Sequence, residues 1–574
     1  MYACASHGYF LLLLTFIGFY DIINVSRDTQ IYLRREFGFK MKKIFRNLAL
    51  ILAFVILLSS FVACNDSDPE EETTVNDANE TTQGNDVDDA TRDEAEETTA
   101  FVSDETTEDE FFFDDTTVED TVEDTVIIIE GETTSGEFIP GTDNGDDDYG
   151  STFYLSIMTE VNPIDYYWIE ENDNSAISNA LYTRQQNIME QLGIEIFAFD
   201  AGYLETYTED FKNSVIGKTG TIDALITHPS VGISNLVTGG YLASFDEVPG
   251  IDLEADYWNR SLMEELSIKD LHLLGFSNFN VVNTYVITYN PDILAEYQDS
   301  LSKSLYQMVD DHEWTLQQFA DIAKLGYVNN GHVDSNRYGL TGLQWVPWCG
   351  FLEASDINLV ERDSEGTYKV SFANETYLEK TKSIVALLSE LSAAEYTCLD
   401  FMSTATPSVP YWTGRALMTL SSTYELDEYT DYHINFGVLP YPMYDVDQQE
   451  YRSLQWGGYI AIPAYMENVS KIGKTLDMLA SLSFDVKNAY YETALGAPIE
   501  EKTDDFRMLE IVWNSASADF AIAFDDVCGS VTYMLPYVTT TDSRGMSLAQ
   551  YANARIPNAD IAIGKFFKRV DKKY

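Results

Sequence analysis

Two tryptophans separated by Val346 and Pro347 are the side chains best suited to contact a carbohydrate. The indoles of Trp345 and Trp348 present flat apolar faces, which pack on the C–H surface of a sugar ring. Pro347 indicates a loop, and a loop that displays two indoles is an unusual way to build a core. We expect Trp345 and Trp348 to contact a ligand, with packing in the core as an equally weighted alternative.

Further candidates stand at predicted strand ends and turns, where they could reach the same ligand. Trp412 and Trp456 each precede a glycine-containing turn, and His228 directly follows a predicted strand. Glu160 and Asn162 follow the first predicted strand, and carboxylates and amides hydrogen-bond well to hydroxyl groups. His228 could equally close its own loop without touching a ligand.

Recognisable catalytic motifs are missing from the sequence. Gly217-Lys218-Thr219 ends like a phosphate-binding loop, but Lys212 stands where that motif requires its first glycine. The six histidines show no metal-binding spacing, and no Gly-x-Ser-x-Gly occurs. We predict that the protein is not an enzyme and holds no cofactor or metal ion. A glycoside hydrolase stays open, because two catalytic carboxylates leave no spacing signature among 95 acidic residues.

The formal net charge of -61 at pH 7 limits the partners of this chain. Nucleic acids and anionic lipid surfaces attract basic faces, which so acidic a protein does not offer. We therefore expect no nucleic-acid partner, and we expect any attachment to a membrane to rely on something other than charge.

Residues 41–63 have the order of a secretory signal, with basic residues ahead of an apolar run. The run over 48–58 is shorter than the roughly 20 residues that a spanning helix needs. The residues that end at Cys64 resemble a bacterial lipobox, in which the cysteine after the cleavage site receives a lipid. We predict a lipid anchor on Cys64, with an uncleaved signal anchor as the alternative. Residues 1–40 are interpreted as an upstream segment ahead of a true start at Met41.

Residues 64–150 form an acidic segment between the anchor and the rest of the chain. Arg92 is the only basic residue there, against 32 Asp and Glu. Such a composition cannot bury enough apolar surface to offset chain entropy, and it predicts a disordered tether.

Residues 151–574 alternate strand-like and helix-like segments, which predicts an α/β fold. Strands are expected over 152–158, 194–199, 224–227, 436–440 and 458–463, and helices over 179–192, 206–216, 378–391, 472–483 and from Thr315 onward. Open sheets of this kind bind ligands at the carboxyl ends of their strands.

The order of several short motifs makes residues 151–574 resemble the family 1 extracellular solute-binding proteins, of which maltodextrin-binding proteins are the familiar type. The motifs are Asn179 to Arg184, Leu192 to Ile196, Asp223 to Ile226, Gly240 to Asp246, Val286 to Pro291, Trp314-Thr315, Gly414 to Met418, Phe436 to Pro440 and Gly457 to Pro463. The resemblance implies a two-lobed, periplasmic-binding-protein-like fold with a hinge. One lobe would comprise about 151–290 and 441–490, and the other about 291–440 and 491–574.

The same resemblance implies a ligand between the lobes and closure of the hinge around it. Tyr289 and Asn290 would occupy the first crossing between the lobes, as hinge residues or as ligand contacts. His228, Trp412 and Trp456 would stand near the ligand. The partners would be a small solute, expected to be a mono- or oligosaccharide, and the permease subunits of an ATP-driven (ABC) importer.

The sequence therefore predicts a monomeric, lipid-anchored binding protein on the outer face of a cell membrane, in a Gram-positive bacterium. A ligand sensor on the same surface is the remaining alternative. The body holds Cys349, Cys398 and Cys528, which cannot all pair. A bridge between Cys349 and Cys398 and three free thiols both stay open.

Overall fold

The computed structural model describes residues 149–574 except 160–161, 203–204, 229–231, 281–282, 364–366, 402–404, 499–500, 530 and 541–545. All of these described residues belong to one unit of the chain. The predicted signal 41–63, the anchor Cys64 and residues 64–148 of the tether lie outside the described residues, as does Glu160.

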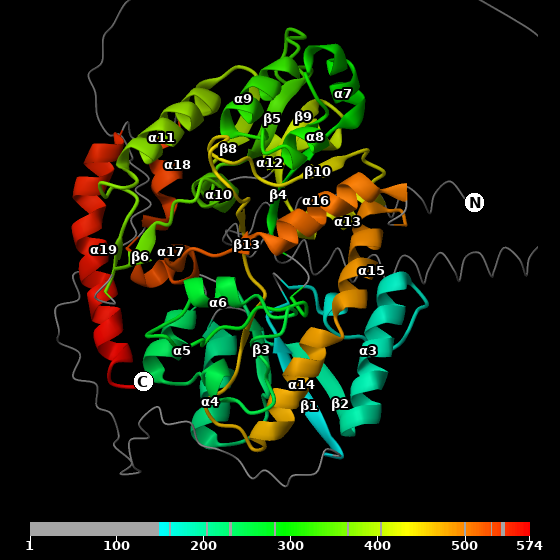
Figure 1. Cartoon of the computed structure of the whole chain (residues 1–574), viewed down its shortest axis with the longest axis vertical. Helices are drawn as coiled ribbons and strands as arrows, with labels where there is room; N and C mark the ends of the chain where they lie inside the picture. Colours follow the sequence, from blue (N-terminus) through cyan, green and yellow to red (C-terminus); the bar gives the residue numbers. More distant parts are fainter. Residues whose placement is uncertain are drawn as a thin grey trace, which may run out of the picture. The chain divides into compact units, whose positions relative to one another are not determined.

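A four-stranded sheet with the order β12-β3-β1-β2 organises the first part of the described chain (Figure 1). Its strands are β1 (Ser151–Ile157), β2 (Ile194–Asp200), β3 (Ala224–Thr227) and β12 (Tyr459–Ala461). β1, β2 and β3 run parallel, and β12 returns antiparallel to β3 at the sheet edge. Every residue of β3 is buried, as expected for a strand of a parallel sheet that is covered on both faces.

Helices connect and flank these strands, so that this sheet has the alternating pattern of an α/β unit. They are α3 (Ala176–Leu192), α4 (Glu205–Gly217), α5 (Ile233–Gly239), α6 (Arg260–Glu265) and α14 (Val469–Ser481). α3 begins where the Ser175 side chain accepts a hydrogen bond from the Ser178 amide, and it ends at Gly193 with φ of 61°. That left-handed conformation is the reason a glycine closes this helix.

A five-stranded sheet with the order β10-β4-β9-β5-β8 organises the second part. Its strands are β4 (Tyr285–Tyr289), β5 (Tyr338–Leu343), β8 (Thr397–Asp400), β9 (Ala416–Ser422) and β10 (Gly437–Leu439). β5 is parallel to β8 and β9, whereas β4 is antiparallel to β9 and β10. The two sheets lie in the lower and upper halves of Figure 1.

Many helices belong to this second part or to the C-terminal region. They are α7 (Pro291–Ala295), α8 (Leu305–Asp310), α9 (Leu316–Leu325), α10 (Val346–Ala354), α11 (Leu378–Ala393), α12 (Ala405–Trp412), α13 (Leu426–Asp431), α15 (Phe484–Leu495), α16 (Thr503–Asn514), α17 (Phe520–Ala523) and α18 (Met534–Thr539). α9 and α12 pack on β5, and α11 packs on β8. As expected for the predicted helix, the Thr315 side chain accepts from the Gln318 amide at the start of α9.

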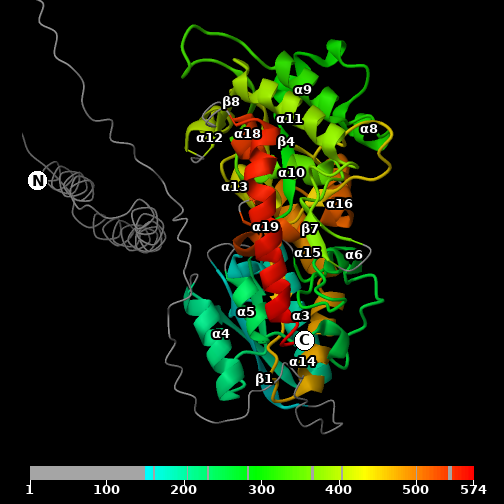
Figure 2. The ribbon, with the colours of Figure 1, turned by 90° about the vertical axis from the view of Figure 1, so that its left-hand side faces the viewer.

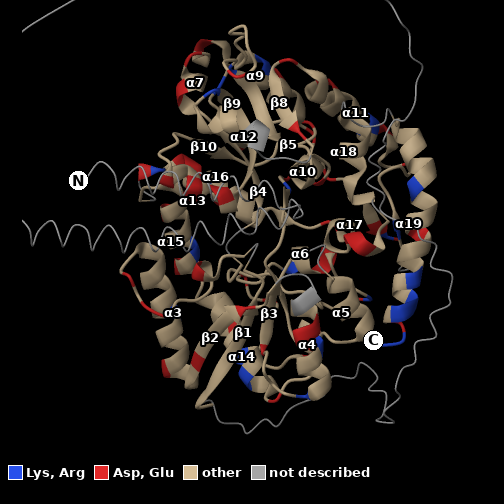
Figure 3. Cartoon of the chain, turned by 180° about the vertical axis from the view of Figure 1, so that it is seen from behind, with Lys and Arg blue, Asp and Glu red and all other residues tan. Residues whose placement is uncertain are grey.

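The last helix, α19 (Leu548–Val570), contacts α5 as well as α18 and β7 (Tyr368–Val370), so it touches elements of both parts (Figure 2). Its last turn carries Lys568 and Arg569, and Figure 3 shows the basic residues gathered toward this end. Cations at a helix C-terminus interact favourably with the helix dipole. None of the helices in the described part has the length and apolar character needed to cross a membrane.

The α/β prediction with two lobes is confirmed, because the strands form two separate main sheets, each flanked by helices, and the chain returns to the first sheet with β12 after completing the second. The expected strands at 152–158, 194–199 and 224–227 correspond to β1, β2 and β3. Cys349, Cys398 and Cys528 all lie within the described residues and form no disulfide, so no bridge joins Cys349 to Cys398.

Candidate functional site

The carboxyl edge of the four-stranded sheet brings together segments that are far apart in the sequence. Thr227, the last residue of β3, pairs with Tyr459, the first residue of the antiparallel β12. The residue after Thr227 and the residues before Tyr459 therefore meet at the same edge. His228 directly follows Thr227, and Trp456, Gly457 and Gly458 directly precede Tyr459.

The rings of His228 and Trp456 are in contact, with centroids 4.7 Å apart and planes at 90°. The imidazole is buried, while the indole keeps part of its surface exposed. Gly457 lies beside them with φ of +109°, and a Cβ there would stand 2.7 Å from His228 Cδ2. Both the backbone conformation and the lack of space therefore require glycine at this position. Two residues chosen separately from the sequence, His228 and Trp456, thus form one cluster.

Three buried amides extend this cluster: Asn162, Asn280 and Asn283. The Asn283 side chain donates to Asn162 Oδ1 at 3.5 Å, and the backbone oxygen of Asn283 accepts from the Trp456 amide at 2.7 Å. Asn280 Nδ2 donates to the carbonyl oxygen of Gly458. Amides carry both donors and acceptors, so such a group can hydrogen-bond to the hydroxyls of a polar solute.

An aromatic cluster lies at the carboxyl edge of the five-stranded sheet. Trp345 follows β5, and Phe401 directly follows Asp400, the last residue of the parallel strand β8. Trp345 stacks on Tyr533 with centroids 4.0 Å apart and planes at 24°, and its ring meets Phe401 edge-on at 5.1 Å. Trp345 remains partly exposed, so this cluster offers an aromatic surface of the kind that packs on sugars.

The two carboxyl edges are linked by a very short connection. Asn283 is bonded to Trp456 at the edge of the first sheet, and Thr284 Oγ1 donates to Gln455 Oε1 at 2.6 Å. The next residue, Tyr285, already pairs with Ser422 at the carboxyl end of β9 in the second sheet. The chain therefore passes from one carboxyl edge to the other within residues 283–285, and a returning segment at 455–456 lies alongside.

A cluster of charged residues holds the returning segment just before this connection. Arg452 Nη2 lies 2.5 Å from Glu353 Oε1 and 2.8 Å from Glu265 Oε1. Burial, and next the charge of Glu353, raise the pKa of Glu265 to about 7 and the pKa of Asp519 to about 8. Glu265 comes from α6, Glu353 from α10 and Asp519 from the start of α17. One arginine thus ties together elements of both parts of the molecule.

The expectation that Trp348 stands on a loop is wrong. Pro347 occupies the first turn of α10, where its missing N–H leaves no helical hydrogen bond unmade. The Trp348 side chain is fully buried, and its indole N–H donates to Thr539 Oγ1 at 2.8 Å. In this structure its ring belongs to the core, while Trp345, at the helix start, keeps an exposed part.

Tyr289, Asn290 and Trp412 lie at the opposite edge of the five-stranded sheet. Tyr289 ends β4 and pairs with Met418 near the start of β9, and Trp412 precedes that same strand. Asn290 is the N-cap of α7, and its Oδ1 accepts two backbone amides. The predicted crossing at Tyr289 and Asn290 is therefore misplaced, because the passage between sheets comes before β4. Trp412 packs against Tyr429 and Tyr432.

Asn280, Asn283 and Tyr533 are not among the residues that the sequence predicts for a site. Asn283 has a φ of 81°, which asparagine tolerates better than most residues, but only the structure reveals this conformation. No local pattern marks Tyr533, which reaches Trp345 from a 3-10 turn at Val531–Tyr533. Within the described residues, no group of three or more His, Cys, Asp or Glu is arranged to hold a metal ion.

No protein-family model matches the chain, and no curated protein matches it. Solved structures similar to it include a maltodextrin-binding domain from Bdellovibrio bacteriovorus bound to maltotriose, at 15% identity and a TM-score of 0.42 over 73% of this chain and 99% of that one. The GacH receptor of Streptomyces glaucescens matches at 14% identity and a TM-score of 0.44, over 74% and 99% of the two chains.

A third similar structure is an ABC substrate-binding protein from Listeria monocytogenes in complex with cycloalternan. It matches at 11% identity and a TM-score of 0.42, over 74% of this chain and 98% of that chain.

Proposed function

We propose that this chain is the solute-binding lipoprotein of an ATP-driven importer and that it captures a carbohydrate between the carboxyl edges of its two sheets. The observation that carries the proposal is the pair of clusters on those edges, His228 with Trp456 and Trp345 with Tyr533, joined through residues 283–285. Each cluster offers a partly exposed indole, and the first adds buried amides.

Capture follows from the connection between the two parts. A solute that contacts both edges stabilises a closed arrangement, in which the two edges are close together, relative to an open one. The indoles of Trp345 and Trp456 pack on the sugar faces, and the Asn283 amide takes a hydroxyl group. The importer's permease subunits receive the loaded, closed form.

The N-terminal residues complete the proposal. A lipid on Cys64 holds the protein at the outer face of the membrane, and the acidic segment after it keeps the binding part near the permease. Replacing Cys64 by alanine should release the protein into the medium, while Cys398→Ala should leave it in the membrane fraction. Release of both variants, or of neither, would argue against this anchor.

Thermal unfolding of the purified protein with a panel of sugars tests the binding proposal. The panel contains monosaccharides, maltotriose, acarbose and ribitol as defined probes. A solute at about 100 times its Kd should raise the free energy of unfolding by about 2.7 kcal/mol. Chromatography of the same mixtures separates a binder from a glycoside hydrolase, since a binder returns the sugar intact. A panel with no stabilising sugar, or one that is hydrolysed, would overturn the carbohydrate-binding proposal.

A further inference from the structure

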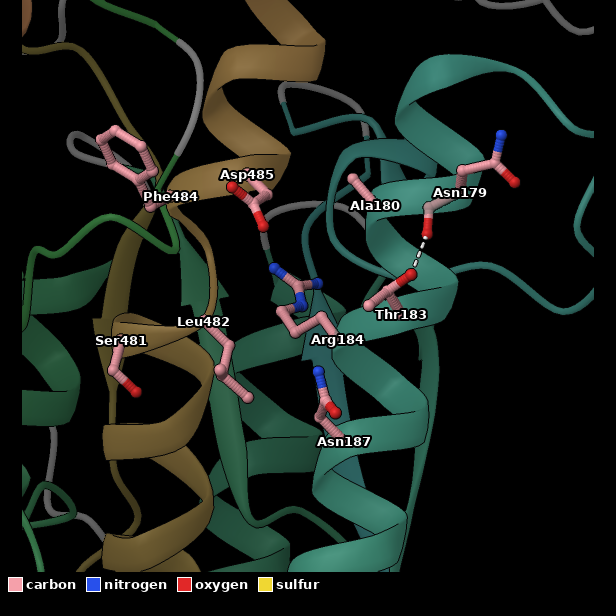
Figure 4. A pocket seen from close by; sticks show the side chains of 9 residues that line it. All are labelled: Asn179, Ala180, Thr183, Arg184, Asn187, Ser481, Leu482, Phe484 and Asp485. Carbon is pink, nitrogen blue, oxygen red and sulfur yellow. Dashed lines mark hydrogen bonds between the residues drawn. The ribbon is translucent and has the colours of Figure 1, made fainter.

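A pocket of about 280 Å³ lies between α3 and the junction of α14 with α15. Its volume is near the lower end, about 300 Å³, of pockets that hold small molecules. Figure 4 shows the side chains that line it: Asn179, Ala180, Thr183, Arg184, Asn187, Ser481, Leu482, Phe484 and Asp485. None of them belongs to the two clusters described above, so this pocket is separate from the candidate solute site.

The Arg184 guanidinium reaches from α3 toward the α14–α15 junction (Figure 4). The residue is 1% exposed. Nη1 donates to Ser483 Oγ at 2.7 Å, and Nη2 donates to the carbonyl oxygen of Tyr167. The face of the guanidinium lies 4.9 Å from the centre of the Phe279 ring. All of these partners are neutral, and Nε has no hydrogen-bond partner among the described residues.

A buried cation without a counter-charge is costly, which is why buried charges in proteins are nearly always paired. Two other mostly buried cations of this molecule follow that rule. Lys471 Nζ lies 3.0 Å from Asp223 Oδ2, and Arg452 is paired with two glutamates. For Arg184, no carboxylate contributes to the pKa, which burial lowers to about 9. Arg184 is one of the residues that line the pocket.

We propose that this pocket binds a small oxyanion, of the phosphate or carboxylate class, with the Arg184 guanidinium as its cationic ligand. The bound anion supplies the missing counter-charge, and the fork of N–H groups matches two oxygens of such an anion. Asn187 adds a neutral amide that can donate hydrogen bonds, whereas the Thr183 hydroxyl already donates to the Asn179 carbonyl oxygen at 2.8 Å. The site is independent of the proposed capture of a carbohydrate.

Asp485 is the one carboxylate that lines the pocket, and it is exposed. Its negative charge opposes the entry of an anion, so it sets the affinity of the site. Replacing Asp485 by asparagine removes that repulsion, because the asparagine side chain has nearly the same size and shape but no charge. The variant should therefore bind the oxyanion several-fold more tightly than the natural chain.

Thermal unfolding and calorimetric titration with inorganic phosphate test the proposal, and sodium acetate serves as a separate carboxylate probe. Phosphate also stabilises proteins by exclusion from their surface, an effect that rises steadily with concentration instead of saturating. Each titration is compared with sodium chloride at equal ionic strength. We expect the melting temperature to rise by a few degrees and to saturate at millimolar phosphate or acetate; whichever anion saturates identifies the class.

Arg184→Met should lose the saturating part of the response. Arg337→Met is the matched control, since Arg337 also lies over an aromatic ring, 5.6 Å from the centre of Tyr297, but is already paired with Glu296 at 2.8 Å. That control should keep the full response. If Arg184→Met does not fold, D485N decides the question through its half-saturation concentration. A response in the natural chain that does not saturate, or D485N binding no tighter, would overturn the proposal.

Discussion

Arg452 and Arg184 are both mostly buried arginines, yet their surroundings differ in kind. Arg452 lies between Glu265 and Glu353 at the connection between the two parts of the molecule, with Nε 3.7 Å from Asp356 as well. Arg184 lies beside a pocket and contacts a hydroxyl, a carbonyl oxygen and the face of Phe279. Arg452 is surrounded by more carboxylates than its single positive charge can neutralise. No carboxylate contacts the guanidinium of Arg184.

This difference indicates two roles for the same side chain. At Arg452 the protein supplies both charges itself, so the group is complete without a ligand and holds α6, α10 and the returning segment together. At Arg184 no carboxylate of the described residues forms an ion pair with the cation, although Asp485 lines the same pocket. A buried cation that is paired with carboxylates of the protein stabilises the fold. A buried cation that lacks such a partner and lines a pocket is a candidate ligand-binding group.

The largest effect is expected from Arg452→Met. The substitution leaves Glu353, which is 1% exposed at its side chain, next to Glu265 and Asp519 without a cation. Breaking a buried pair in this way costs about 3–5 kcal/mol. Unfolding in urea at pH 7 should show a loss of this size. A loss below about 1 kcal/mol would mean that Arg452 is not essential to the connection.

A smaller effect is expected from pH on the same cluster. The pKa of Glu265 is raised to about 7 in the folded protein, against about 4.3 in an unfolded chain. The folded state therefore binds the proton more tightly. The stabilisation is complete below about pH 4 and is lost as the pH rises toward 7. Between pH 5 and 7 the free energy of unfolding should fall, and in Glu265→Gln it should fall by about 1–2 kcal/mol less.

The control for this measurement is a carboxylate whose pKa is shifted the other way. The Arg362 guanidinium beside exposed Asp270 lowers the pKa of that carboxyl, so Asp270→Asn should leave the slope between pH 5 and 7 unchanged. An identical slope in Glu265→Gln and in the natural chain would contradict the pH prediction.

The smallest effect is expected from Arg184→Met in a chloride buffer. Methionine keeps the unbranched apolar part of the side chain, and the substitution removes a buried charge that leaves no carboxylate without its ion-pair partner. The two lost hydrogen bonds to neutral acceptors are worth about 1 kcal/mol each, and relief of the desolvation cost offsets them. The free energy of unfolding should change by less than about 1 kcal/mol. A loss as large as that of Arg452→Met would show that Arg184 is already neutralised within the fold.

The sequence predicted the alternation of strands and helices well, because buried apolar runs and end signals such as Gly193 and Thr315 act locally. It also selected His228 and Trp456, which follow and precede strands that pair with each other. It misplaced the crossing at Tyr289, since nothing local reveals which sheet a buried strand joins. It misread Pro347, because a proline is as acceptable in the first turn of a helix as in a loop.

Other features were beyond sequence reasoning because they depend on contacts across the whole chain. Arg184 meets Ser483 and Tyr167 only after α3, α15 and the segment after β1 have packed together. Trp345 stacks on Tyr533, which lies far along the chain. Such pairs follow from the tertiary structure and leave no spacing pattern.

Calorimetric titration of the best-binding sugar tests most directly whether the solute is held between the two carboxyl edges. The variants are Trp456→Ala on one edge and Trp345→Ala on the other, with Trp168→Phe as the control, since the Trp168 indole donates to the Ile196 backbone. We predict that each alanine variant raises the Kd at least tenfold, which corresponds to a loss of about 1.4 kcal/mol or more of binding free energy. The Kd of the control should stay within about twofold of that of the natural chain. Unchanged affinity in both alanine variants would contradict the account.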